Sequence, residues 1–149
     1  MDHLQEKVQK ILDDYIASKK LRKTKERNII LSLIYQYPYH FTVEELYIYM
    51  KKKQIKISRA TLYNTIDLLL ECNLIKKHLF DDRSFFYEKA YKKHQHDHII
   101  CKKCSKIVEF CDPRLNQIIE DIAQINSFEI NNHELYLYGL CEECKKSKI

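Results

Sequence analysis

The chain has 149 residues and a formal net charge of +5, a length that suits one domain or two small ones. No apolar run approaches the ~20 residues that a membrane-spanning helix needs, and the amino terminus alternates charged with apolar residues, unlike a signal peptide. These features argue against a membrane partner and against a secreted disulfide scaffold, so we expect a cytoplasmic protein.

Three helices are predicted in the first part of the chain. Apolar residues at helical spacing predict a helix over residues 3–18, and Thr24 predicts the N-cap of a second helix after a strongly basic run. Thr42 and Glu45 form a capping box, in which the hydroxyl accepts from one backbone amide while the carboxylate reaches back to the other. A third helix is therefore expected to begin after Thr42.

A fourth helix follows a short basic connection and is capped by Ser58. A helix, a short connection and a second helix form the helix-turn-helix arrangement, in which exposed residues early in the second helix meet base edges in the major groove. We therefore expect this helix to read DNA. The predicted contacts on it are Arg59, Thr61, Tyr63 and Asn64.

A strand pattern over residues 74–80, a turn over 81–84 and a second strand over 85–88 predict a wing after the reading helix. Residues 1–93 contain 19 Lys and Arg against 12 Asp and Glu, whereas residues 94–149 contain 7 against 9. The excess of positive charge accompanies the predicted winged helix. Together the two features favour double-stranded DNA as the partner.

The remainder of the chain predicts a small α/β lobe. Two strands are expected around residues 96–100 and 106–110, a helix from Pro113 to near residue 126, and further strands at 128–130 and 135–138. The predicted fold class is α+β: an N-terminal winged helix-turn-helix domain followed by a small α/β dimerisation domain with a four-cysteine zinc site. The expected boundaries are 1–89, a hinge over 90–94, and 95–149.

Two Cys-x-x-Cys pairs lie in this second lobe. Four thiolates in two such pairs can close a tetrahedral zinc site, which would supply folding energy to a lobe too small for a large core. A thioredoxin-like redox motif and buried free thiols are the alternatives. The four predicted ligands of structural Zn²⁺ are Cys101, Cys104, Cys141 and Cys144.

Histidines precede the first cysteine pair. His96 and His98 are two residues apart, so on a strand their imidazoles leave the same face, while Asp97 points the opposite way. Glu109 on the next predicted strand can add a carboxylate. Imidazole with carboxylate suits Fe²⁺, Mn²⁺ or Zn²⁺. A solvated strand edge is the other interpretation.

Several motifs together resemble a known family. They are Thr42-x-x-Glu45-Leu46-Tyr47, Ala60-Thr61-Leu62-Tyr63, His96-Asp97-His98-Ile99-Ile100-Cys101-x-x-Cys104, Ile107-Val108-Glu109-Phe110 and Leu135-Tyr136-Leu137-Tyr138-Gly139-x-Cys141-x-x-Cys144. The chain from about residue 20 to residue 144 resembles the ferric uptake regulator superfamily. The resemblance implies a homodimeric repressor that binds operator DNA with metal as co-repressor, controls iron homeostasis and is not an enzyme.

The resemblance also implies site residues. It places Arg22 in the minor groove and Tyr63 on a base. A regulatory ion, Fe²⁺ or Mn²⁺ with Zn²⁺ able to substitute in vitro, would bridge the hinge and hold the winged helices at the spacing of the operator half-sites. The implied ligands of this ion are His40, Glu88, His96, His98 and Glu109.

The sequence departs from the family pattern in two places. A third metal site would use Gln95, Asp97, Asn116 and His133, but two of these are amides, so Asp97 and His133 are left as a degraded site. Asn64 stands where iron regulators commonly have arginine.

Asparagine at this position also occurs in peroxide-sensing relatives, which oxidise a histidine with iron; His40 and His96 would be the oxidisable pair. Glu109 argues against that alternative, because that branch typically has Asp there.

Two other classes of function are separable by experiment. A metalloenzyme would turn over a substrate, and a DNA-binding module that holds zinc without sensing would bind its operator equally with and without added metal. We expect neither, nor any small-molecule substrate. Pairing of dimers into tetramers is left open.

Overall fold

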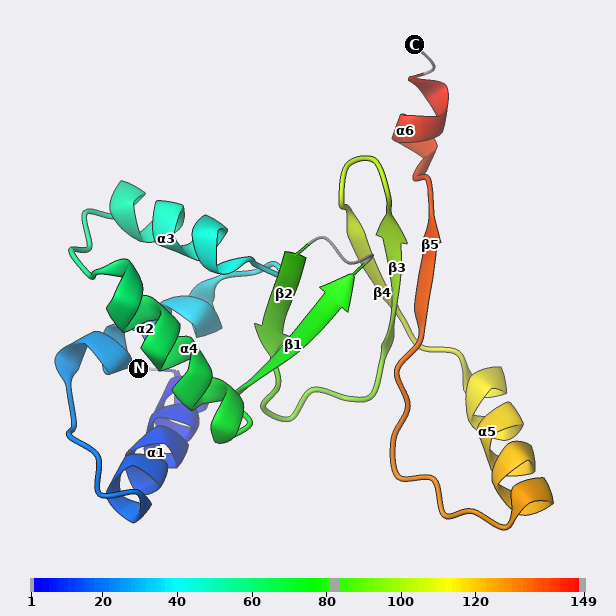
Figure 1. Ribbon diagram of the computed structural model, residues 1–149, viewed down its shortest axis with the longest axis horizontal. Coiled ribbons are helices and arrows are strands. Elements are labelled where there is room, and N and C mark those ends of the chain that lie inside the picture. Colours follow the sequence, from blue (N-terminus) through cyan, green and yellow to red (C-terminus); the bar gives the residue numbers. More distant parts are fainter. Residues whose placement is uncertain (1, 81–83, 148–149) are drawn as a thin grey trace. The chain divides into compact units, whose positions relative to one another are not determined.

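A computed structural model describes residues 2–80 and 84–147 of the chain. The chain divides into two compact units, the first ending at Lys93 and the second beginning at His94 (Figure 1). Within the described part of the chain, every helix is too short or too polar to cross a bilayer. The predicted boundaries, with a hinge over residues 90–94, stay a prediction.

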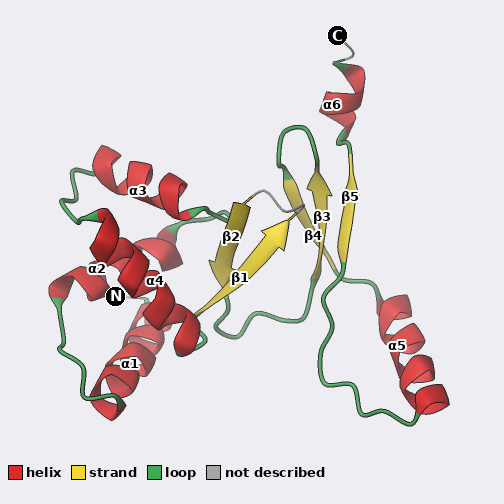
Figure 2. Cartoon of the chain, viewed as in Figure 1, coloured by secondary structure: helices red, strands yellow, loops and turns green. Residues whose placement is uncertain are grey.

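The described residues of the first unit form four helices and a two-stranded sheet (Figure 2). In chain order the elements are α1 (His3–Ser18), α2 (Lys25–Gln36), α3 (Val43–Lys52), α4 (Arg59–Glu71), β1 (Ile75–Phe80) and β2 (Ser84–Lys89). The predicted caps are confirmed. Thr42 Oγ1 accepts from the amide of Glu45 at 3.1 Å, and Glu45 Oε2 accepts from the amide of Thr42 at 2.9 Å. Each such cap stabilises its helix by about 1 kcal/mol.

One apolar cluster forms the core of the first unit and draws residues from all four helices. In α4, Leu62, Ile66 and Leu69 are buried in this cluster. Tyr63, on the other side of the helix, is 50% exposed. The helix predicted to read DNA therefore packs one face on the core and leaves the other available.

Strands β1 and β2 pair antiparallel, from Ile75 opposite Lys89 to Phe80 opposite Ser84. This pairing confirms the predicted hairpin, although residues 81–83 of its turn lie outside the described residues. An isolated bridge joins Phe41, just before α3, to Tyr87 of β2, with backbone hydrogen bonds of 3.1 and 2.8 Å. The bridge fixes the segment that carries His40 against the strand that carries Glu88.

In the second unit, residues 94–147 form a three-stranded sheet and two helices. Its elements are β3 (Asp97–Cys101), β4 (Ile107–Phe110), α5 (Pro113–Asn126), β5 (Tyr136–Gly139) and α6 (Glu142–Lys146). The strand order is β4-β3-β5, with β3 antiparallel to β4 and parallel to β5. The fold class predicted from the sequence is confirmed.

The strand predicted at residues 128–130 is wrong. Ser127 takes a left-handed backbone conformation that ends α5, and the amide of Phe128 donates to the carbonyl of Ala123 at 2.9 Å. The amide of Phe128, which could otherwise pair with a neighbouring strand, is thus used in the C-terminal cap of α5. The following residues form no strand in the described chain, so α5 leads to β5 through an extended loop.

The second unit exposes much apolar surface. No residue of α5 is buried, and Ile118, Ile122 and Ile125 are all exposed. On the sheet, Ile99 lies opposite Val108 and Leu137 in register, and these three side chains are also exposed. An apolar helix stripe and an apolar sheet face on the surface are the mark of an interface.

Candidate metal centres

The pairing of β3 with β5 brings the four predicted cysteines together. Cys101 ends β3 opposite Gly139 of β5, and the amide of Lys102 donates to the Gly139 carbonyl at 2.8 Å. The second pair then follows at the start of α6, where Cys141 is the N-cap. The four sulfur atoms lie within 4.8 Å of one another.

This arrangement of sulfurs fits zinc. Cys104 Sγ and Cys141 Sγ are 3.8 Å apart. A tetrahedron with Zn–S bonds of about 2.3 Å has edges of about 3.8 Å. Four thiolates and no open position would make a closed, structural site rather than a catalytic one. The remaining cysteines of the chain, Cys72 and Cys111, lie outside this cluster.

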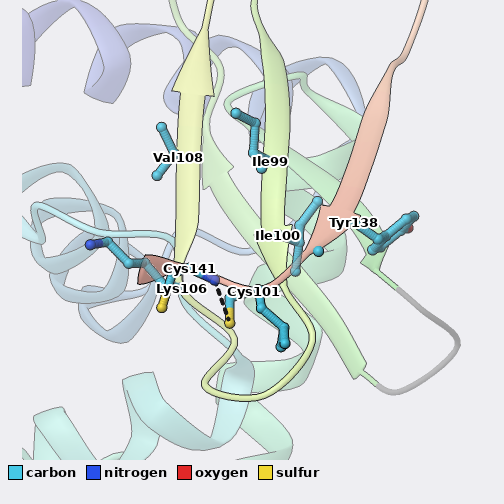
Figure 3. A pocket seen from close by; sticks show the side chains of 9 residues that line it. Ile99, Ile100, Cys101, Lys106, Val108, Tyr138 and Cys141 are labelled. Carbon is cyan, nitrogen blue, oxygen red and sulfur yellow. Dashed lines mark hydrogen bonds between the residues drawn. The ribbon is translucent and has the colours of Figure 1, made fainter. Parts of the chain in front are cut away.

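The electrostatics of the cluster also favour a cation. The backbone amides of Cys104 and Cys141 lower the pKa of Cys101 to about 6; the amide of Cys141 lies 3.4 Å from Cys101 Sγ (Figure 3). The hydrogen bond with Cys141, burial and the neighbouring sulfurs raise the pKa of Cys144 to about 12. One thiolate is therefore favoured, and the last requires a compensating positive charge.

A pocket lies beside these cysteines at the end of the sheet, and Figure 3 shows the side chains that line it. Ile99, Val108 and Tyr138 line it together with Cys101 and Cys141. The structural centre therefore adjoins the surface that a partner would cover.

The first unit contributes one group of imidazoles around a buried carboxylate. Glu88 on β2 is 3% exposed, and its Oε2 lies 2.9 Å from His40 Nε2. Its Oε1 lies 2.7 Å from Nε2 of His78 on β1, and Lys93 Nζ lies 3.2 Å from Oε2. His40 and Glu88 were predicted from the family pattern, whereas His78 and Lys93 were missed.

The hairpin register explains how His78 could have been found. His78 lies opposite Phe86 and Lys76 lies opposite Glu88, so His78 and Glu88 leave the same face of the hairpin two positions apart. Once the turn of the hairpin is predicted, the register of its two strands follows, and this register places His78 and Glu88 diagonally next to each other. Lys93 has no comparable signal, because it lies beyond the strand in irregular chain.

The second unit contributes a separate group of two imidazoles and a carboxylate. His98 on β3 lies directly opposite Glu109 on β4, as alternation along the strands requires. His96 Nε2 is 3.8 Å from Glu109 Oε1, and the rings of His96 and His98 have their centroids 4.8 Å apart. These are the donor types that suit Fe²⁺, Mn²⁺ or Zn²⁺.

The predicted degraded site lies on the other face of the same strand. Asp97 is 3% exposed, and its Oδ1 lies 3.0 Å from His133 Nε2. Neither atom makes a hydrogen bond despite this distance, so the ring is not aligned for one. Gln95 donates its side-chain amide to the carbonyl of His133 at 3.0 Å. One carboxylate and one imidazole remain, fewer donors than a firm divalent site needs.

The predicted DNA-binding residues differ in whether their side chains are exposed or engaged in contacts within the protein. Tyr63 and Asn64 are exposed on α4, and Arg22 is exposed in the basic segment before α2. Arg59 instead pairs with Glu44 and stacks 4.4 Å from the ring centroid of Tyr47, both on α3.

Thr61 also makes a local contact, since its hydroxyl accepts from that of Ser58 at 3.0 Å. Tyr63 and Asn64 are therefore the side chains of the reading helix best placed for bases.

A winged helix joined to an α/β lobe with a four-cysteine centre and imidazole–carboxylate groups defines a class of metal-binding winged-helix proteins. Residues 18–138 match the model of the ferric uptake regulator family. The chain belongs to this family.

Relatives of both sensing types are similar to the chain. The ferric uptake regulation protein of Campylobacter jejuni is 36% identical over 130 residues, which are 86% of this chain and 82% of that protein. The peroxide-responsive repressor of Staphylococcus epidermidis is 32% identical over 138 residues, 91% of each chain.

Among solved structures, the Helicobacter pylori ferric uptake regulator, with three functional metal-binding sites, matches with a TM-score of 0.88. It is 28% identical, and the match covers 97% of this chain and 96% of that one. The Vibrio cholerae regulator matches with a TM-score of 0.75 at 30% identity, over 87% of this chain and 98% of that one.

Proposed function

We propose that this protein is a metal-responsive transcriptional repressor of iron homeostasis that binds double-stranded operator DNA as a homodimer. Fe²⁺, or Mn²⁺ in its place, is the co-repressor, and Zn²⁺ is structural. The protein acts in the cytoplasm and is not an enzyme. The observation that carries the proposal is that each unit holds imidazole and carboxylate donors, one group on the winged-helix unit and one on the lobe with the cysteines.

The cysteine centre would hold Zn²⁺ as a structural ion. Cys101, Cys104, Cys141 and Cys144 would bind it as thiolates, and its positive charge would favour deprotonation of Cys144, whose pKa is raised by the hydrogen bond with Cys141, by burial and by the neighbouring sulfurs. Apparent binding energies of structural zinc reach ~10 kcal/mol or more. That energy would stabilise the second unit, in which neither α5 nor α6 has a buried residue.

The regulatory site would combine His40 and Glu88 of the first unit with His96, His98 and Glu109 of the second. Donors from only one unit make an incomplete site, so affinity for the ion depends on both units being held together. By linkage, the bound ion then favours that arrangement by the same free energy. In a dimer this fixes the two winged helices at one spacing, which an operator with matching half-sites can recognise.

The dimer would form through the second unit. Its exposed apolar surface comprises the stripe of α5 and the sheet face around Ile99. Each first unit would then present Tyr63 and Asn64 to the major groove and Arg22 to the minor groove. Asparagine pairs through two hydrogen bonds with adenine, which predicts an adenine at the position it meets.

Metal-dependent DNA binding tests this function. Zinc-loaded protein is titrated onto labelled operator DNA by fluorescence anisotropy, with and without Mn²⁺, which avoids iron oxidation. Mn²⁺ should tighten binding, and His96→Ala should abolish the Mn²⁺ effect. His94→Ala is the matched control, because the His94 side chain is exposed and outside the donor group. A His96→Ala protein that still requires Mn²⁺ contradicts the site assignment.

Peroxide sensing is the second candidate function, favoured by Asn64 and by the similarity to the Staphylococcus epidermidis repressor. In that case hydrogen peroxide, the two-electron oxidant, would transfer one oxygen atom to the ring of His40 or His96 and leave as water, with Fe²⁺ at the site promoting the reaction. Mass spectrometry of peptides after exposure of the Fe²⁺ and Mn²⁺ forms to peroxide decides the question. Oxidation of these histidines in the iron form alone supports peroxide sensing, and unmodified histidines support iron sensing.

A further inference from the structure

The two carboxylate oxygens of Glu88 have different surroundings within the first unit. Oε1 is held by His78 at 2.7 Å, in a pair whose side chains are each 3% exposed. Oε2 faces His40 at 2.9 Å and the ammonium of Lys93 at 3.2 Å. Oε2 thus faces the proposed ligand His40 and the Lys93 ammonium, whereas Oε1 contacts the buried ring of His78, which lies outside the proposed ligand set.

The ring of His78 has little freedom to turn away. It stacks on Phe80, with centroids 5.4 Å apart and planes within 5°, and Phe80 is itself 2% exposed. A carboxylate oxygen only accepts, so the short contact places a ring proton on Nε2 of His78. Strand pairing, stacking and this hydrogen bond therefore fix Glu88 Oε1 in one position.

We propose that His78 is a positioning residue for the regulatory ion. It holds Oε1 of Glu88, so that the carboxylate offers Oε2 alone and binds the ion through one oxygen. This inference rests on the proposed function, in which Glu88 is a ligand. Groups that orient metal ligands from outside typically change metal affinity 10–100-fold when removed. The role of His78 is thus to set the affinity and the coordination mode of the sensing site.

A purely structural role would give a different result. Removal of His78 would then leave a buried carboxylate oxygen without its donor and lower the stability of the hairpin. The folded fraction would still bind metal with its original affinity and geometry. Metal affinity and the spectrum of the bound ion therefore separate positioning from structure.

The test compares three substitutions in full-length, zinc-loaded protein. His78→Phe keeps a ring that can stack on Phe80 but cannot donate. His78→Gln keeps an N–H donor with the reach of Nε2, and His78→Asn has the same amide but is one methylene shorter. Mn²⁺ affinity is measured by electron paramagnetic resonance of the free ion. Co²⁺ is added as a second probe, because its visible absorption bands report coordination number and geometry.

The proposal predicts that His78→Phe and His78→Asn weaken Mn²⁺ binding roughly 10–100-fold and alter the Co²⁺ bands. His78→Gln should restore the affinity to within a few-fold and restore the spectrum. Should the phenylalanine variant not fold, the comparison of Gln with Asn decides alone. Wild-type affinity and spectrum in folded His78→Phe or His78→Asn protein overturn the proposal, as does an equal loss in Gln and Asn.

His96→Ala in the same assay separates this proposal from the proposed function. Loss of Mn²⁺ in His96→Ala with unchanged binding in His78→Phe refutes only the positioning role. Unchanged binding in His96→Ala refutes the regulatory site itself and this inference with it. Zinc content at the cysteine centre is measured in every variant and should not change.

Discussion

The cysteine centre and the proposed regulatory site differ in how the chain supplies their ligands. All four cysteines belong to the second unit and are brought together by pairing within one sheet. The donors of the proposed regulatory site come as two groups, with His40 and Glu88 in one unit and His96, His98 and Glu109 in the other. A site complete within one unit can stabilise that unit, whereas a site that needs two units can report on their arrangement. The donor types differ in the same way. The cysteine centre offers thiolates, and the proposed regulatory site offers imidazoles and carboxylates.

The largest predicted effect is at the cysteine centre. Cys101→Ser should remove structural zinc, and with it folding energy of the order of 10 kcal/mol, so that the second unit unfolds and the dimer dissociates. Zinc content, circular dichroism and size-exclusion chromatography measure this. Cys111→Ser is the control, since Cys111 is exposed and outside the cluster. A folded, dimeric Cys101→Ser protein would show that the centre does not support the fold.

The next largest effect is at a regulatory ligand. Glu109→Gln should retain zinc, dimer and melting temperature but lose metal-dependent DNA binding, because Glu109 is a proposed ligand whose side chain is one-third exposed, and glutamine keeps its size. The loss of Mn²⁺ affinity should exceed the roughly 10–100-fold typical of groups outside the ligand shell. Titration with operator DNA and free Mn²⁺ measures it, with exposed Glu129→Gln as the control. If Glu109→Gln unfolded, Glu109 would be needed for the fold, and this would contradict the distinction between a structural cysteine centre and a regulatory site.

A smaller effect is expected at Asp97 and His133, the two residues that remain of the third metal site. His133→Ala removes the imidazole ring that lies 3.0 Å from the buried Asp97 carboxylate and should lower the free energy of unfolding by about 0.5–3 kcal/mol, the usual range for a single substitution. The Mn²⁺ response of DNA binding should remain. Chemical denaturation and the anisotropy assay measure the two quantities. Loss of the metal response with unchanged stability would mean that this pair is a working metal site.

The smallest effect should come from Lys93, and it has the opposite sign. The ammonium of Lys93 lies 3.2 Å from Glu88 Oε2, the oxygen proposed to bind the ion, so the two cations compete. Because the lysine side chain is one-third exposed, its pairing is worth only about 0.2–1 kcal/mol. Lys93→Gln should therefore tighten Mn²⁺ binding roughly 1.4–5-fold, whereas exposed Lys92→Gln should leave it unchanged. Weaker binding in Lys93→Gln would mean that Lys93 supports the site.

Local signals made most of the fold predictable. Caps such as Thr42 and Ser58 fix where helices begin, because a side-chain oxygen must satisfy amides that the helix leaves unpaired. The wrong strand at residues 128–130 has a non-local cause. Phe128-Glu129-Ile130 alternates apolar and polar residues and so predicts a strand, but so short a segment forms one only when a partner strand is available, and here the chain closes α5 instead.

The sites were predictable to the extent that spacing encodes geometry. Two Cys-x-x-Cys pairs and a His-x-His on a strand carry their geometry in the sequence. The grouping of His40 with Glu88 came from family resemblance, because their contact depends on the bridge from Phe41 to Tyr87, 46 positions apart. His78 was missed because its role depends on the register of a hairpin. Lys93 was missed because irregular chain has no periodicity to exploit.

The number of Mn²⁺ ions bound tests most directly whether one regulatory ion needs both units. Zinc-loaded wild type, Glu88→Gln from the first unit and His96→Ala from the second are titrated with Mn²⁺ under electron paramagnetic resonance. We predict one tightly bound Mn²⁺ per protomer in the wild type and loss of that same ion in each variant, with zinc retained. Tight Mn²⁺ binding that survives in either variant would contradict a site shared between the two units.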